Sequence, residues 1–321
     1  MKVLVTGANG FLGSWLCKRL QAEGHDVTAL VRKNSDLSEI EHLNLNYENG
    51  DVTQIESLEA AFKNKEYIFH LAGVVAYSKH QRALMDKVNI QGTQNVVNVL
   101  AKQQNAKLLN LSSVVAIGSS FEPVILNETS PYTIHDLNLG YFETKRKAEQ
   151  IVTEAALKNE IHAININPST IYGSGDAKKG SRKNQIKVAQ GKLPFYTGGG
   201  VNVVAVEDVC DGIIKAIQNG QNGQRYILAS DNMTIKELFS KIAHFAGAKS
   251  PSIYLPFSLL RLIGMIGDIR GKGISTENAY TSSMYHWFSN EKAKKELGFN
   301  PRPSDIAIEN SVRWMKDHNL V

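Results

Sequence analysis

Three residues of this chain could together move a proton to or from a substrate oxygen. Tyr141 and Lys145 are four residues apart in a segment of helical periodicity, so both side chains emerge on one helix face. A free phenol has a pKa of about 10, but a neighbouring ammonium favours the phenolate and lowers that pKa. Tyr141 could then act as a general acid or base, while Ser113, at the end of an expected strand, holds the reacting oxygen.

The first fifteen residues predict the element that would position a ligand beside these groups. Residues 3–5 form an apolar run typical of a buried strand. Gly7, Gly10 and Gly13 follow at even spacing, and a helical pattern begins at Phe11. A strand that turns through glycines into a helix offers free backbone N–H groups and the positive end of a helix dipole. This arrangement predicts a dinucleotide pyrophosphate site; the alternative is a tight turn without a ligand.

The end of the second expected strand, residues 25–31, indicates which dinucleotide binds. Dinucleotide folds place a carboxylate there for the ribose hydroxyls, or an arginine for a 2′-phosphate. This chain has Arg32, and its next acid is Asp36. A guanidinium binds phosphate through paired, charge-assisted hydrogen bonds, so NADP(H) is predicted over NAD(H). The alternative is that Arg32 stacks on the adenine or faces solvent.

Strand and helix patterns alternate along the first two-thirds of the chain, which predicts an α/β fold with a doubly wound parallel sheet. The carboxyl edge of such a sheet binds ligands, and Asp51, residues 71–73 and Ser113 are expected there. After the first strand, further strands are expected over 25–31, 43–47, 67–71, 107–111 and 161–167, and helices over 11–23, 55–62, 81–102 and 137–158.

A smaller substrate lobe is expected from two separate pieces of the chain. Residues 1–167 and 201–229 are assigned to the dinucleotide-binding domain, the second piece as a strand, a helix and a strand. Residues 168–200 and 230–321 form the other lobe, which is expected to be mostly helical. Residues 168–200 are expected to be loop-like and basic. Their part 178–192 is either a solvated loop or a site for a substrate diphosphate, with Lys178, Lys179, Arg182, Lys183, Lys187 and Lys192.

Composition narrows the remaining choices. The net charge of +5 and the lack of long like-charge runs argue against nucleic acid. Cys17 and Cys210 are the only cysteines, which favours a reducing, cytoplasmic compartment, and no histidine spacing predicts a metal site. The apolar stretch 253–269 contains Arg261 and Asp268, which argues against a spanning helix and favours a core or interface helix over a membrane-surface one. Monomer and homodimer stay open.

The motifs together resemble the extended short-chain dehydrogenase/reductase family, also described as NAD(P)-dependent epimerases and dehydratases. They are TGANGFLG, GDV, HLAG, LSSVVAIG and YFETK, in the family's order, and GKLPFYTGGGVNVVAVEDVCDGI is similar to the dihydroflavonol-4-reductase-like and hopanoid-associated sugar-epimerase-like branch. The resemblance implies a Rossmann fold and a Ser113, Tyr141 and Lys145 centre, with Lys145 also binding the nicotinamide ribose. Implied cofactor contacts are Gly7, Asn9, Gly10, Phe11, Leu12, Gly13, Arg32, Asp51, Val52, Leu71, Ala72, Gly73, Asn89, Tyr141, Lys145, Pro168 and Ile171.

Departures from the family pattern help to choose a reaction. Val114 and Val115 occupy the places where dehydratases carry carboxylates, and a side chain that does not titrate cannot act as acid or base, which argues against dehydration. Asn167 stands where relatives often have arginine. The leading hypothesis is an NADP(H)-dependent reductase of a small carbonyl substrate. An NAD-dependent nucleotide-sugar epimerase is the second, and a non-catalytic dinucleotide sensor the third.

Overall fold

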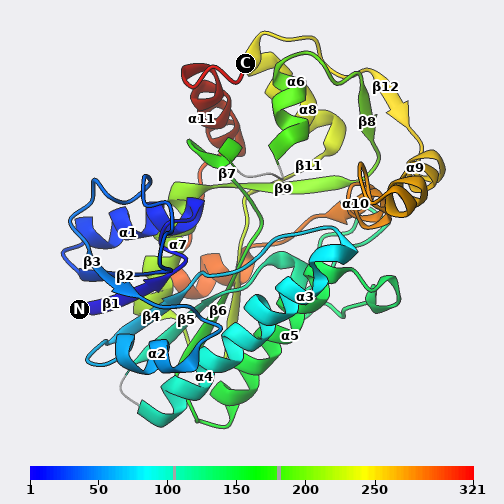
Figure 1. Cartoon of the computed structure of the whole chain (residues 1–321). Coiled ribbons are helices and arrows are strands. Elements are labelled where there is room, and N and C mark those ends of the chain that lie inside the picture. Colours follow the sequence, from blue (N-terminus) through cyan, green and yellow to red (C-terminus); the bar gives the residue numbers. More distant parts are fainter. Residues whose placement is uncertain (104–105, 179–181) are drawn as a thin grey trace.

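A seven-stranded parallel sheet forms the centre of the molecule (Figure 1). The computed structural model describes residues 1–103, 106–178 and 182–321. The strands are ordered β10-β6-β5-β4-β1-β2-β3, and each neighbouring pair is parallel. Their bounds are β1 Lys2–Thr6, β2 Asp26–Val31, β3 Asn46–Asn49, β4 Tyr67–His70, β5 Lys107–Leu111, β6 Ala163–Pro168 and β10 Arg225–Leu228.

Helices cover both faces of this sheet, because each face of a parallel sheet is apolar and must be buried. On one face Leu16 of α1 and Ile213 of α7 pack into one core cluster, and on the other Leu58 of α2 and Val152 of α5 pack into a second. The predicted doubly wound parallel sheet is therefore confirmed. These helices are α1 Phe11–Ala22, α2 Ile55–Ala61, α4 Gly92–Gln103, α5 Gly140–Leu157 and α7 Val206–Asn219.

Two elements of the sheet domain differ from the sequence expectation. Strand β3 begins at Asn46 rather than Leu43, because Leu43 and Leu45 pack against the core from the preceding turn while the edge strand itself is exposed. The helix expected over 81–102 is interrupted by a π-helical segment, Asp86–Gln91, between α3 Arg82–Met85 and α4. This segment carries Asn89.

A second sheet lies beside the first and contains β9, Gly200–Ala205. Strand β9 pairs with β7 Thr170–Tyr172, β11 Asp231–Thr234 and β13 Tyr285–His286, so it does not rejoin the central sheet as expected. Within the run expected to be a loop, the structure has α6 Lys183–Ala189 and β8 Phe195–Thr197. Val188 and Ala189 of α6 are buried in the core of this part, which fixes the segment as a helix. The exact lobe boundaries stay a prediction.

The C-terminal part combines helices with short strands. It contains α8 Ile235–Ala246, β12 Ile253–Leu255, α9 Phe257–Arg270, α10 Thr276–Thr281 and α11 Ser304–Asp317. No helix within the described residues has the length and apolar character to cross a membrane. Shorter 3-10 turns cover Lys79–Gln81, Val114–Ala116, His135–Leu137 and Asp176–Lys178, and a π-helical turn covers Ala293–Leu297.

Candidate functional site

The glycine turn after β1 has the geometry of a phosphate cradle. Gly7 has φ +70°, and a Cβ there would lie 2.8 Å from the Ala72 nitrogen. A Cβ on Gly13 would lie 2.1 Å from the Gly7 carbonyl oxygen, so only glycine lets the helix approach the turn this closely. Gly10 caps α1 without a side-chain hydrogen bond, which leaves the first N–H groups available to a ligand. The turn therefore fits a dinucleotide pyrophosphate.

Ser113, Tyr141 and Lys145 meet at the carboxyl end of β5. The Ser113 hydroxyl is hydrogen-bonded to the Tyr141 hydroxyl, and Lys145 Nζ donates to the Leu111 carbonyl oxygen at 2.6 Å. Gly73 lies in the loop after β4, and a Cβ on it would lie 4.0 Å from Lys145 Nζ. Backbone from the loop after β4 thus borders the same ammonium, and the three candidate catalytic residues form one cluster.

Burial sets the protonation of this cluster. It raises the pKa of Tyr141, nearby Tyr77 adds to the increase, and the Ser113 hydrogen bond opposes it. The same burial lowers the pKa of Lys145 to about 8, while the Glu149 carboxylate acts in the opposite direction. The direction at Tyr141 differs from the lowering expected beside an ammonium, because removal from water is the largest effect and the Ser113 hydrogen bond opposes it only in part. In the protein alone Tyr141 carries its proton.

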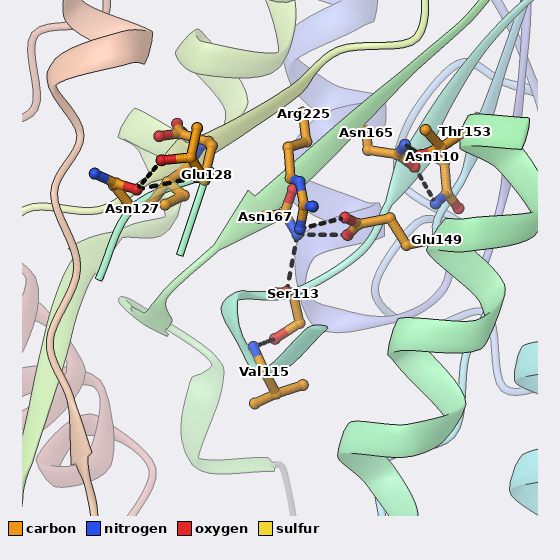
Figure 2. Close-up of polar contacts among 12 residues, drawn as sticks. Asn110, Ser113, Val115, Asn127, Glu128, Glu149, Thr153, Asn165, Asn167 and Arg225 are labelled. Atoms are coloured by element: carbon orange, nitrogen blue, oxygen red, sulfur yellow. Dashed lines mark hydrogen bonds and ion pairs between the residues drawn. The ribbon is translucent and has the colours of Figure 1, made fainter. Parts of the chain in front are cut away.

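Asn167 and two charged residues, Glu149 and Arg225, form a group of polar contacts beside Ser113 (Figure 2). Asn167 Nδ2 donates to the Ser113 carbonyl oxygen at 2.9 Å and to Glu149 Oε2 at 2.6 Å. Arg225, on neighbouring β10, lies 3.2 Å from Glu149 Oε1. Glu149 is buried and stands one turn after Lys145 on α5. The asparagine that departs from the family pattern therefore links the strand end that carries Ser113 to the helix that carries Tyr141 and Lys145.

Asn89 joins the loop after β4 to α5 by hydrogen bonds. Its Oδ1 accepts from the Val74 N–H at 2.7 Å, and its Nδ2 donates to the Val74 carbonyl oxygen at 2.9 Å and to Thr144 Oγ1 at 3.2 Å. Asn89 is buried. In the structure it is a positioning residue, and a direct contact with a cofactor stays a prediction.

The other predicted cofactor residues lie around the carboxyl edge of the sheet. Arg32 is exposed just past β2, and among the described residues its side chain has no hydrogen bond or ion pair. Asn9 donates to the Asp36 carbonyl oxygen at 3.0 Å, and Asp51 accepts from the Thr53 N–H at 2.8 Å. Buried Leu12 and Val52 are core residues; Phe11, Leu71 and Ala72 are partly exposed at the turn or after β4; Pro168 ends β6 and Ile171 lies in β7. Their contacts with a cofactor stay predictions.

Sequence reasoning missed two residues near the site. The Tyr77 ring lies 5.9 Å from the Tyr141 ring in an edge-on arrangement. Its position six residues past Leu71 was a usable signal, since loops at this edge line ligand sites. Arg182, expected within a basic loop, is only 4% exposed and is ion-paired with Asp176 at 3.3 Å. No local pattern marks that pairing; Lys179, from the same run, lies outside the described residues.

Comparisons with known proteins agree with this geometry. The model of the NAD dependent epimerase/dehydratase family matches residues 3–229. The chain is 26% identical to a putative dihydroflavonol 4-reductase from Synechocystis sp., over 99% of this chain and 95% of that protein. It is 23% identical to sterol demethylase protein B from Methylococcus capsulatus, over 100% of both chains. A crystal structure of gox2253 has a TM-score of 0.89 at 32% identity and covers 100% of this chain and 99% of its own. The chain belongs to the NAD dependent epimerase/dehydratase family and is an enzyme of the extended short-chain dehydrogenase type that uses a nicotinamide dinucleotide.

Proposed function

We propose that this enzyme reduces a carbonyl group of a small apolar substrate with NADP(H). The observation that carries the proposal is a protonated Tyr141 bonded to Ser113, one helical turn from Lys145. A phenol that keeps its proton at neutral pH can donate it to the oxygen of a substrate during reduction. Oxidation of the alcohol is the reverse of the same step.

The three side chains would divide the work at the substrate oxygen. Ser113 Oγ donates a hydrogen bond that orients the carbonyl, and the Tyr141 hydroxyl gives its proton to the oxygen as negative charge develops there. Lys145 stabilises the phenolate that Tyr141 becomes. The nicotinamide dinucleotide, when bound, supplies the hydride that the carbonyl carbon accepts. Hydride on carbon and proton on oxygen together give the alcohol.

Arg32 supports NADP(H) as the preferred cofactor. Its guanidinium is exposed after β2 and has no hydrogen bond or ion pair within the described part of the chain, at the edge where the adenosine ribose of a dinucleotide fold lies. Removing one charge-assisted phosphate contact costs about 1.5–3 kcal/mol. Arg32→Ala should therefore weaken NADPH binding by at least about tenfold and leave NADH binding unchanged, measured by nicotinamide fluorescence titration. Lys63→Ala, an exposed lysine elsewhere, is the control.

An apolar substrate is supported by the neighbours of Tyr141. It belongs to an apolar cluster with buried Val115 and Met284 and with partly buried Tyr77 and Tyr280. The names of two relatives refer to a dihydroflavonol reductase and a sterol demethylase. Dihydroflavonols and sterols both present broad apolar rings, which such a cluster would accommodate.

A nucleotide-sugar epimerase is the second candidate, because the matching family is named for NAD-dependent epimerases and dehydratases. The two functions separate in one experiment. The purified enzyme is assayed with NADPH against a panel of cyclic and aryl ketones, and any nucleotide that copurifies is identified by mass spectrometry. Turnover of ketones with NADPH supports the reductase. Tightly held NAD⁺ together with inert ketones would replace it by the epimerase.

A further inference from the structure

Helix α9 turns its large apolar side chains toward solvent. Leu259, Leu262, Ile266 and Ile269 recur at helical spacing along one face, and Ile269 is 86% exposed. Ile263 and Met265 flank this row and are also exposed. Only Leu260 and Gly264 of the helix are buried. This segment is therefore not a core helix, and the interface helix expected as the alternative stays untested. We call the four residues of the row together with Ile263 and Met265 the α9 apolar face.

The inner side of α9 explains why this orientation is fixed. Gly264 and Gly267 face the chain before α10, where a Cβ on them would lie 2.9 Å from the Ser275 and 1.9 Å from the Ile274 carbonyl oxygen. Such backbone-to-backbone packing holds the helix closely and admits no larger residue. Asp268 adds a carboxylate contact to the Thr276 N–H at 3.3 Å. Because the helix packs through its glycines, its isoleucine and leucine side chains stay exposed and are available to a partner.

Two neighbouring strands extend the apolar surface. Ile253 and Tyr254 of β12 are 51% and 53% exposed, and β12 pairs with β8, where Phe195 is also exposed. Figure 1 shows β8, β12, α9 and α10 gathered at one end of the molecule. Exposed apolar side chains gathered at one end of a folded protein mark a candidate interaction site.

The charges around the α9 apolar face identify the partner. Arg261, Arg270 and Lys272 are exposed and have no ion-pair partner among the described residues. The one acid between residues 253 and 274, Asp268, is engaged with Thr276. A two-fold dimer through this face would bring the cations of both copies together with no acid beside them, whereas an anionic lipid headgroup layer neutralises them.

We propose that α9 and β12 dock this enzyme on the surface of an anionic lipid bilayer. The helix has 14 residues and is about 21 Å long, shorter than the ~30 Å hydrocarbon core, so it lies in the interface rather than across it. Isoleucine and leucine side chains enter the acyl boundary while the basic residues stay at headgroup level. The surface exists whichever reaction the enzyme performs, so the inference does not depend on the proposed function.

The docking surface also adjoins the candidate active site. Phe257, the first residue of α9, packs against Tyr280 with ring centroids 5.4 Å apart, and Tyr280 shares an apolar cluster with Tyr141. Phe121 completes this contact at 5.8 Å from the Phe257 ring. A continuous line of aromatic rings thus leads from the start of the docking helix to the cluster that holds the candidate proton donor.

Vesicle sedimentation tests the proposal. The full chain is mixed with phosphatidylcholine vesicles, with and without roughly a quarter of phosphatidylglycerol, at low and high salt. The protein should sediment with the anionic vesicles, and high salt should weaken but not abolish binding, since apolar burial persists while charge is screened. Leu262→Glu with Ile266→Glu should lower the vesicle partition coefficient by at least about tenfold, because two carboxylates replace apolar side chains at the interface.

A matched control separates docking from misfolding. Ile306→Glu changes an isoleucine that is 42% exposed on α11, the same exposure as Ile266, and should leave vesicle binding unchanged. Analytical ultracentrifugation of the wild type without vesicles tests the competing occupant. If the wild type stays in the supernatant with anionic vesicles, or if it forms a dimer that the double substitution dissociates, the lipid proposal is overturned.

Discussion

The environment of Lys145 shifts its pKa toward the range in which activity can be measured. It is held against the Leu111 carbonyl, and burial lowers its pKa to about 8 while Glu149 resists the decrease. Above that pH the ammonium becomes neutral, and a phenolate formed on Tyr141 loses its stabilising charge. The site therefore works below the pKa of this lysine.

The pH dependence of kcat/KM checks this property, since it reports groups of the free enzyme. We expect an alkaline limb near pH 8, along which kcat/KM falls about tenfold per pH unit. Lys145→Arg should keep part of the activity and move the limb upward, because a guanidinium stays protonated. Glu149→Gln should move it downward, because the charge that opposes the decrease is gone. A wild-type profile that is flat to about pH 10 would contradict the assignment.

At the scale of single residues, some contacts of the candidate site could be predicted from the sequence and others could not. Tyr141 and Lys145 could be paired from their spacing alone, because both lie on one helix. Asn167, Glu149 and Arg225 could not be joined in advance, since they come from β6, α5 and β10 and meet only when those elements pack. The burial of Arg182, expected in a basic loop, could not be predicted for the same reason: its partner Asp176 is buried and accepts a hydrogen bond from Ser311, which is distant in the sequence.

Among the elements, the turn between β1 and α1 strictly limits which of its glycines can be replaced by a residue with a side chain. Its second and third glycines make a matched pair, because a Cβ on Gly13 would meet the Gly7 oxygen at 2.1 Å while one on Gly10 would meet it at 3.2 Å. The first contact is impossible without displacement of the helix, whereas the second needs a shift of a few tenths of an ångström.

Gly13→Ala should therefore lower the free energy of unfolding by about 1–3 kcal/mol and abolish dinucleotide binding. Gly10→Ala should change the stability by less than about 1 kcal/mol, the helix-propensity range. Urea unfolding and dinucleotide titration measure both effects. Equal losses in the two variants would show that the close approach at Gly13 does not control the cradle.

Elements with clear periodicity were predictable, and those whose environment decides their role were not. The alternation of buried strands and amphipathic helices gave the parallel sheet, whose strands and covering helices follow from the pattern. Strand β9 has the same apolar composition as a central strand but pairs in the second sheet, because β7 and β11 flank it. Helix α9 is mostly apolar apart from Arg261, Asp268 and Arg270, and its two inward glycines determine which side stays outside.

Across the whole molecule, His70 couples folding to pH. It is buried at the end of β4, hydrogen-bonded to Thr6 Oγ1 at 2.9 Å and to Thr93 Oγ1 at 3.1 Å, so it joins β1, β4 and α4. Burial lowers its pKa from 6.5 to about 3, with nearby Lys145 adding to the decrease. The unfolded chain binds a proton at His70 between these values and the folded chain does not.

Because the pKa of His70 is depressed in the folded state, its contribution to stability is present above pH 6.5 and is lost as the pH falls toward 3. Within this window we expect His70 to lower the free energy of unfolding by up to about 1.4 kcal/mol for each unit by which the pH falls. Urea unfolding at several pH values between about 7.5 and 5, where the protein is expected to stay folded without urea, gives the slope of the free energy of unfolding against pH. His70→Gln should reduce it, and His80→Gln, at an exposed site, should not. Identical slopes in all three proteins would mean that the pKa of His70 is the same in the folded and the unfolded chain.

The transfer of a labelled hydride tests the central assignment, Tyr141 as proton donor in carbonyl reduction, most directly. NADPH deuterated at the transferable C4 position is mixed with a ketone that the wild type reduces, and the product is analysed by mass spectrometry. The account predicts deuterium on the alcohol carbon, and a Tyr141→Phe variant that binds NADPH normally but reduces the ketone at least about 10²-fold more slowly. A variant that keeps the wild-type rate, or a product that carries no deuterium, would contradict it.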